Sequence, residues 1–275
     1  SNALFFYKKW IETRTLDDGS FEVDVRKVNK PRKFKVKIYL KDDKLKVVKV
    51  PLSIRQKVSP ITIFKDPAFW HTSEVTFPDV VIRERDPVTR KTTKKSKNNQ
   101  RRASIWYVVK TLQKRFEDVD PWLNFNKKKI RIVYPANFHT WAEGKRVHIH
   151  RKYYKIKTII HETMHLWNYQ HNTGTSQWIG DWFWKGTHNV TKPNVAFHEG
   201  FANFAAHQLK NELFSLSGGD IPFKKYWISN AKNANTLAEM ESIDDASESM
   251  LRFLVYPTPE KLRFGDTITN NISGN

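Results

Sequence analysis

Apolar and polar residues alternate along the first part of the chain. The alternation covers residues 21–25 and 34–40 and continues over 45–47, with lysine at most polar positions of the last two segments. A period of two predicts β-strands that are buried on one face. Residues 41–44, Lys-Asp-Asp-Lys, form a turn signal between two of the strands. We therefore expect an antiparallel sheet with one apolar and one basic face, within a small β-rich, sandwich-like module over residues 4–82.

A strongly polar segment follows this module. Residues 83–102 contain nine basic residues and almost no apolar ones, which is typical of a linker or an exposed loop. The segment has no aromatic residues between the basic ones that would stack on bases, so the pattern does not favour a nucleic-acid-binding arm. Helical spacing of apolar residues returns over 103–116. Two further strands are predicted over 129–134, ended by Pro135, and over 145–150.

Two apolar helices are predicted in the second part of the chain. The stretch from Tyr153 to Gln170 contains no Gly or Pro, and its apolar residues recur at helical spacing. The stretch from Pro193 to Leu209 is similarly apolar. Both segments are long enough to form buried helices.

Residues 161–165 lie within the first of these helices and read His-Glu-Thr-Met-His, which has the form H-E-x-x-H. Residues four apart share one face of a helix, so His161 and His165 can bind one metal ion. Glu162 lies beside them and can take a proton from a metal-bound water. The strand over 145–150 leads into this helix, and a strand edge can hold an extended peptide by main-chain hydrogen bonds. The pattern predicts a catalytic Zn²⁺ site that acts on a peptide or protein substrate.

The second helix carries a further motif, His-Glu-Gly-Phe-Ala over residues 198–202, and Trp167 lies two residues after His165. The chain therefore contains H-E-x-x-H-x-W followed by E-G-F-A. This pairing resembles the gluzincin zinc metallopeptidases and is closest to their aminopeptidase N-like branch. The resemblance covers residues 129–256. It implies an α+β fold in which a zincin-like (gluzincin) catalytic domain over residues 103–275 follows the β-rich module and the basic linker.

The resemblance also implies the roles of individual residues. The zinc ligands would be His161, His165 and Glu199. The family stabilises the transition-state oxyanion with a Tyr or His downstream of the Glu ligand, and the candidates here are Tyr226, Tyr256 and His207. The G-A-M-E-N exopeptidase motif of the family is absent, and residues 141–145 stand in its place. Endopeptidase and exopeptidase action therefore both stay open.

A second choice of third ligand comes from spacing alone. His171 follows His165 at the H-E-x-x-H-x-x-x-x-x-H spacing of metzincins, with Asn168 at the position usually held by Gly. Asn tolerates the left-handed backbone that such a turn needs. Against this alternative, residues 166–170 continue the helical apolar pattern. It also leaves Glu199, a carboxylate on an otherwise apolar helix, without the partner that a buried charge needs.

Composition narrows the choice of partners. The net charge is +20, and residues 1–160 contain 39 Lys+Arg and 16 Asp+Glu, whereas residues 161–275 contain 9 and 12. A basic front half attracts anionic surfaces or polymers. A basic binding protein with a structural or inactive zinc site, closed by His171 or His198 as fourth ligand, is therefore the alternative to a peptidase. The chain contains no Cys and no transmembrane segment is predicted. An exported or cell-surface location is slightly favoured over a cytoplasmic one.

Overall fold

The structure, a computed structural model, describes ten parts of the chain: residues 13–16, 20–22, 35–49, 58–65, 82–86, 88–119, 129–137, 139–143, 145–171 and 193–214. The elements in chain order are β1 (Lys35–Ile38), β2 (Leu45–Val48), β3 (Ile61–Lys65), α1 (Lys94–Val119), β4 (Ile130–Ala136), β5 (Trp141–Glu143), β6 (Arg146–His150), the 3₁₀-helix η2 (Arg151–Tyr153), α2 (Ile156–His171) and α4 (Pro193–Phe214).

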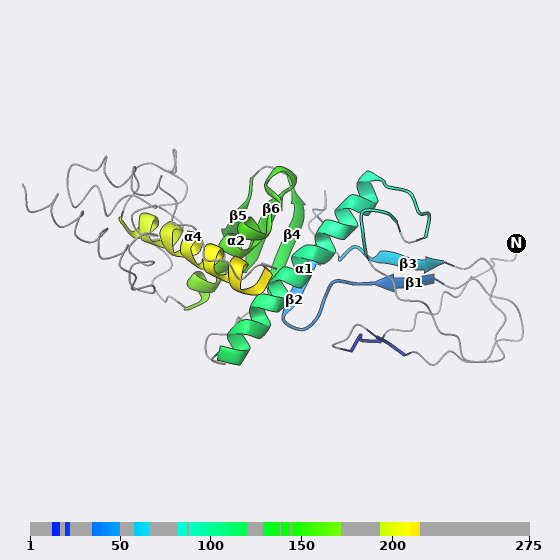
Figure 1. Cartoon of the computed structure of the whole chain (residues 1–275), viewed down its shortest axis with the longest axis horizontal. Helices are drawn as coiled ribbons and strands as arrows, with labels where there is room; N and C mark the ends of the chain where they lie inside the picture. The colour runs from blue at the N-terminus through cyan, green and yellow to red at the C-terminus, as the bar shows by residue number, and fades with distance from the viewer. Residues whose placement is uncertain are drawn as a thin grey trace, which may run out of the picture.

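The larger of two sheets has four strands in the order β2-β4-β6-β5. The strands β2, β4 and β6 are parallel, and β5 runs antiparallel to β6 at the edge. Parallel neighbours need a long crossover connection, and α1 supplies it between β2 and β4. The helices α1, α2 and α4 group beside this sheet (Figure 1).

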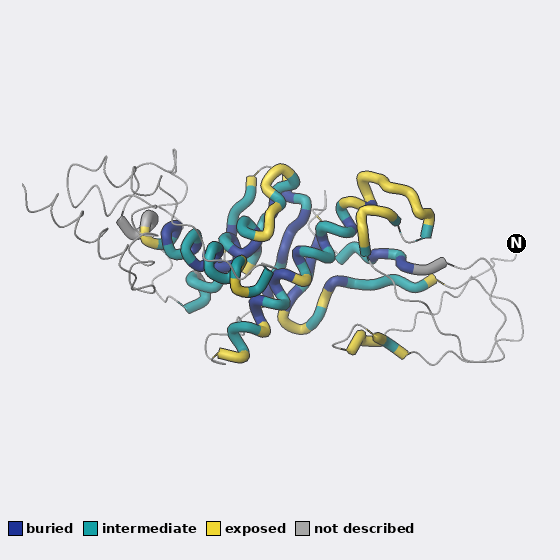
Figure 2. The backbone as a smooth tube through the Cα atoms, in the orientation of Figure 1, coloured by how far each residue is buried: buried dark blue, intermediate teal, exposed yellow. Residues whose placement is uncertain are grey.

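One face of the sheet and the three helices enclose a common core. Alternate residues of the parallel strands are almost completely buried and belong to one cluster with residues of the helices (Figure 2). The strand residues of this cluster are Leu45, Val47, Ile130, Ile132, Tyr134, Val147 and Ile149. Because full burial of one such aliphatic side chain contributes roughly 1.5–3 kcal/mol, these contacts hold α2 firmly against the sheet.

The structure confirms the elements that have a clear period. The strands predicted over 129–134 and 145–150 form as β4 and β6, although β4 passes Pro135 and ends at Ala136. The apolar helices form as α2 and α4. The strand over 145–150 is not an edge, however. The strand β6 pairs with β4 on one side and β5 on the other, so the short strand β5 forms that edge of the described sheet.

The predicted antiparallel pairing of the front strands forms only next to the turn, where the main-chain N of Val47 donates to the Leu40 carbonyl oxygen at 2.9 Å and Lys41 and Lys46 form an isolated antiparallel bridge. The strand β1 pairs with β3, and β2 joins the parallel sheet beside β4. The strand β2 thus connects the predicted module over residues 4–82 to the predicted catalytic domain by main-chain hydrogen bonds. Alternation fixes which face of a strand is buried but not which partner it has. The division into domains stays a prediction, and this pairing does not favour it.

The prediction of a linker over residues 83–102 is wrong for its second half, because α1 begins at Lys94 rather than Ala103. Two reciprocal hydrogen bonds cap its first turn: the Ser96 main-chain N donates to Thr93 Oγ1 at 3.0 Å, and the Thr93 N donates to Ser96 Oγ at 2.8 Å. Lys, Arg and Gln are good helix formers. The buried Arg102 side chain donates to the carbonyl oxygen of Ser59 and to Asn99 Oδ1.

Several predictions fall outside the described residues. These are the strand over 21–25 beyond residue 22, and the oxyanion candidates Tyr226 and Tyr256. Among the described residues, no helix combines the length and the apolar character that crossing a membrane requires.

Candidate metal centre

The helix α2 places two histidines side by side. Its core-facing residues, among them Ile159, Ile160 and Met164, are almost completely buried and fix its rotation against the sheet. His161 and His165 are one turn apart, so both rings leave the helix on the same side. Their ring centroids are 4.5 Å apart, and the ring planes are perpendicular.

The helix α4 brings a carboxylate to these two rings. It packs against α2 with small residues at its buried positions: Gly200, Ala202, Ala205 and Ala206. Small side chains allow two helix backbones to approach closely. This contact places Glu199, which is only 6% exposed, against both histidines.

The ligand atoms of the three residues converge on one point. The Nε2 atoms of His161 and His165 are 2.9 Å apart. Each Nε2 atom lies 3.3 Å from Glu199 Oε2. A tetrahedral zinc site with bonds of about 2.0–2.1 Å has separations of roughly 3.3–3.4 Å between its ligand atoms. The two separations to Glu199 Oε2 match this value, and the separation between the two Nε2 atoms is shorter. These three residues are the group that the described residues offer for a metal ion.

The charges at the centre favour an ionised carboxylate. Burial alone would raise the pKa of Glu199. The charge of His165 and the hydrogen bonds from both imidazoles outweigh burial and hold this pKa well below its usual value. The pKa of the neighbouring His198 is lowered, first by burial and then by the charge of His165. A neutral His198 adds no positive charge that would oppose a bound cation.

Glu162, the predicted general base, lies on α2 directly after His161 and is 8% exposed. It does not belong to the group of three ligand residues. The structure thus contains two buried carboxylates in this region, and it is Oε2 of Glu199 that lies 3.3 Å from each imidazole Nε2.

The alternative ligand His171 lies elsewhere. The helix α2 continues through Asn168 to His171 without the turn that a metzincin-like arrangement needs. The ring of His171 stacks on Trp167 with centroids 4.4 Å apart, and its Nδ1 lies 2.8 Å from the Trp167 carbonyl oxygen. His171 is not part of the group formed by His161, His165 and Glu199.

The structure shows one contact that the sequence did not predict. The side chain of Asn168 is hydrogen-bonded to Nδ1 of His198, so it joins α2 to α4 next to the ligand residues. The sequence patterns predict Asn168 only as a turn residue and His198 only as a fourth ligand. The signal in the sequence was proximity, because Asn168 follows the predicted ligand His165 by three residues and His198 directly precedes the predicted ligand Glu199.

Of the candidates for the oxyanion, only His207 is described. It lies on α4 eight residues after Glu199, which is about 12 Å along the helix axis at 1.5 Å per residue. An imidazole does not extend that far, so this position does not favour His207 as a group that contacts the same substrate atom as the metal.

Glu143, on the edge strand β5, lies 3.3 Å from His148 Nε2 and 3.4 Å from Arg146 Nη1.

Comparison of the chain with protein-family models, with curated proteins and with solved structures finds no match.

Proposed function

We propose that this protein is a zinc-dependent metallopeptidase in which His161, His165 and Glu199 bind the metal and Glu162 is the general base. The observation that supports the proposal is the convergence of two imidazole nitrogens and one carboxylate oxygen within 3.3 Å of one another. Three protein ligands leave a fourth position open for water, as in catalytic zinc sites, whereas structural sites are closed by four. Neither His171 nor His198 belongs to the group.

The chemistry follows from the residues at the site. Zinc bound by three such ligands lowers the pKa of a water molecule toward ~7 and polarises a carbonyl oxygen. Glu162 takes the proton of the attacking water and then passes it to the leaving amine of the peptide. Glu199 stays ionised and holds both imidazoles in place, because its oxygen contacts each Nε2 atom. The described edge of the sheet next to α2 is β5, whose outer main-chain groups could pair with an extended peptide.

Replacement of Glu162 by Gln tests the proposal. Glu162→Gln keeps the shape of the side chain but removes the base, so zinc content should stay at about one ion per chain. Turnover of a quenched-fluorescence peptide library should fall by about 10²–10⁴-fold, the contribution of a positioned general base. Glu212→Gln is the matched control, since it makes the same change at an exposed residue that pairs with Arg115 outside the metal centre, and it should retain both zinc and turnover.

Two results would contradict the proposal. Equal turnover by the wild type and Glu162→Gln would exclude Glu162 as the base. A wild type that binds zinc and cleaves no peptide of the library would favour a binding protein with a structural site.

A further inference from the structure

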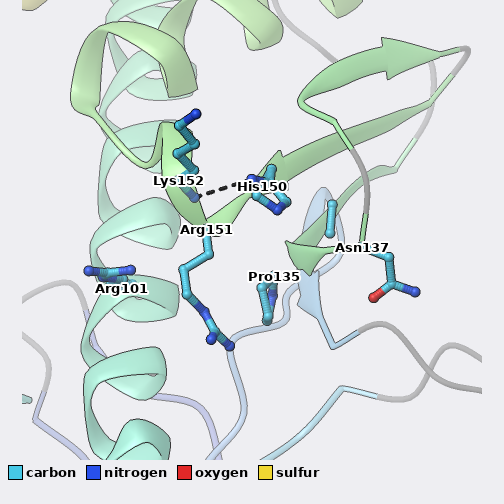
Figure 3. Close-up of a pocket in the computed structure, with 7 residues that line it drawn as sticks. Arg101, Pro135, Asn137, His150, Arg151 and Lys152 are labelled. Carbon is cyan, nitrogen blue, oxygen red and sulfur yellow. Dashed lines mark hydrogen bonds between the residues drawn. The ribbon is translucent and has the colours of Figure 1, made fainter.

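A pocket lies at the carboxyl ends of two parallel strands, and no residue of the metal centre lines it. It has a volume of about 540 Å³. Its walls come from three places: Arg101 on α1, residues 135–137 at the end of β4, and residues 150–152 at the junction of β6 and η2 (Figure 3). None of its lining residues is acidic, and three of them, Arg101, Arg151 and Lys152, carry a permanent positive charge. Crevices at the carboxyl ends of parallel strands are common ligand sites.

Arg101 is held rigidly at one wall of this pocket. Its Nη1 atom donates a hydrogen bond of 3.2 Å to the hydroxyl of Tyr134, which is completely buried. Its guanidinium also lies over the ring of Tyr154, 5.2 Å from the centroid. The hydrogen bond to Tyr134 raises the pKa of Arg101, so the side chain is always charged. An arginine has five N–H donors, and Tyr134 takes one of them.

His150 presents a donor as well. Its Nδ1 accepts a hydrogen bond of 3.2 Å from the main-chain N of Lys152. In a neutral imidazole, an accepting Nδ1 leaves the proton on Nε2, which is then a donor. The main-chain N of His150 donates to Thr140 Oγ1 at 2.9 Å, which fixes this end of β6. The tautomer of His150 therefore adds a donor to a pocket that already has three cations.

Arg151 has a donor without an acceptor. Its Nε atom is buried and has no hydrogen-bond partner among the described residues. A buried donor without a partner is costly. Arginine binds oxyanions in a bidentate way through two adjacent N–H groups. A bound oxyanion that turned this guanidinium would supply an acceptor to Nε.

We propose that this pocket binds the phosphate group of a small phosphorylated molecule. Donors reach it from α1, from β6 and from η2, and a tetrahedral phosphate offers several oxygens to donors from different directions, whereas a carboxylate offers two in one plane. The volume falls within the range of small-molecule sites, roughly 300–1,000 Å³, and exceeds what one phosphate group fills. Inorganic phosphate and a phosphate monoester share this chemistry.

The test is a titration of the full chain followed by calorimetry, at constant ionic strength in chloride. The probes are inorganic phosphate, adenosine monophosphate and glucose 6-phosphate. Because phosphate also binds zinc, the titration is made with Glu199→Ala protein after treatment with a chelator. Its result is then independent of the proposed peptidase activity. Saturable binding of phosphate is expected, and Arg151→Gln or Arg101→Gln should weaken it at least tenfold, as for loss of a charged hydrogen bond.

Arg146→Gln is the matched control. Arg146 lies on the same strand, β6, at its other end, where it pairs with the exposed Glu143. The substitution removes the same charge, and phosphate binding should change less than twofold. Circular dichroism shows whether each variant folds, and Arg151→Gln alone provides the test if Arg101→Gln does not fold.

The outcomes separate the sources of phosphate. Tighter binding of either monoester than of inorganic phosphate assigns the pocket to a phosphorylated small molecule. Absence of saturable binding of all three probes would overturn the proposal. Equal weakening by Arg146→Gln and Arg151→Gln would also overturn it, since this result would reflect the overall charge alone.

Discussion

At the scale of single residues, Glu199 keeps a negative charge at a position where burial opposes it. Its carboxylate is 6% exposed, and its low pKa depends on two imidazoles whose Nε2 atoms lie 3.3 Å from its Oε2. The Nε2 atoms themselves are 2.9 Å apart. Two lone pairs and a carboxylate oxygen at these distances repel one another unless a proton or a cation lies between them. A divalent metal ion would balance all three at once.

We predict that replacement of Glu199 by Ala weakens zinc binding by more than the ~10–100-fold cost of losing an outer hydrogen-bond partner of a ligand. The same change at His171 should have an effect of less than about twofold, because its ring stacks on Trp167 instead. Competition with a chelating dye measures both affinities. The opposite ranking would assign the third ligand to His171.

Sequence alone identifies the paired histidines because i,i+4 spacing is a property of one helix. It leaves Glu199 and His171 as alternatives on residue grounds, since the choice depends on how α4 packs on α2. That contact relies on Gly200 and Ala202, which the apolar pattern does not distinguish from other core residues. The hydrogen bond from Asn168 to His198 was missed for the same reason.

At the scale of elements, local patterns predict the strands and helices better than their partners. The turn over residues 41–44 forms as predicted with a short antiparallel contact across it, but β1 pairs with β3 and β2 joins β4. Asp42 stabilises this turn. Its Oδ1 accepts from the main-chain N of Lys44 at 2.8 Å and of Leu45 at 2.6 Å, and its Oδ2 lies 2.9 Å from Nζ of Lys110 on α1. Asp42 thus links the start of β2 to α1 by a hydrogen bond to Leu45 and an ion pair with Lys110.

We predict that Asp42→Ala lowers the free energy of unfolding by about 1.5–3 kcal/mol at pH 7, the net value of one hydrogen bond to a charged group. Burial would raise the pKa of Asp42, but the bond to Lys110 and those from the main chain lower it below its usual value. The stabilisation of the folded state by ionised Asp42 is therefore complete above about pH 4, the pKa of an unfolded Asp. It is lost as the pH falls through the lower pKa of the folded state.

Urea unfolding of the wild type and the variant at pH 7 and pH 3 measures this difference. Asp43→Ala is the control. Asp43 pairs with Arg14 at a fully accessible position, with side chains 78% and 82% exposed, so its loss should have little effect. A difference at Asp42 that is as large at pH 3 as at pH 7 would exclude the charge as its cause.

At the scale of the whole molecule, part of the positive charge lies on strands of the same sheet that packs against α2. Lys46, Arg131 and Arg146 occupy matching register positions on β2, β4 and β6. The chain neighbours of Lys46 and Arg131 on both sides are core residues. Burial lowers the pKa of Lys46, and the charges of Arg131, Lys129 and Lys145 lower it further. Lys46 precedes the predicted linker, whereas Arg131 and Arg146 follow it. A fragment of residues 1–102 would lack β4 and β6, so binding to anionic surfaces has to be measured with the full chain.

We predict that the full chain binds vesicles with anionic headgroups at low salt and does not bind zwitterionic vesicles. Exposed charges are screened over about 10 Å at 0.1 M salt, so half a molar salt should release the protein.

Lys94 and Lys95 lie exposed in the first turn of α1, which has no acidic residue. Each basic residue near an anionic surface contributes about 1 kcal/mol, so the double change to Gln should weaken binding about thirtyfold. Lys210→Gln, on α4, should change it little. Vesicle sedimentation measures binding, and no binding at low salt would reduce the basic charge to a role in solubility.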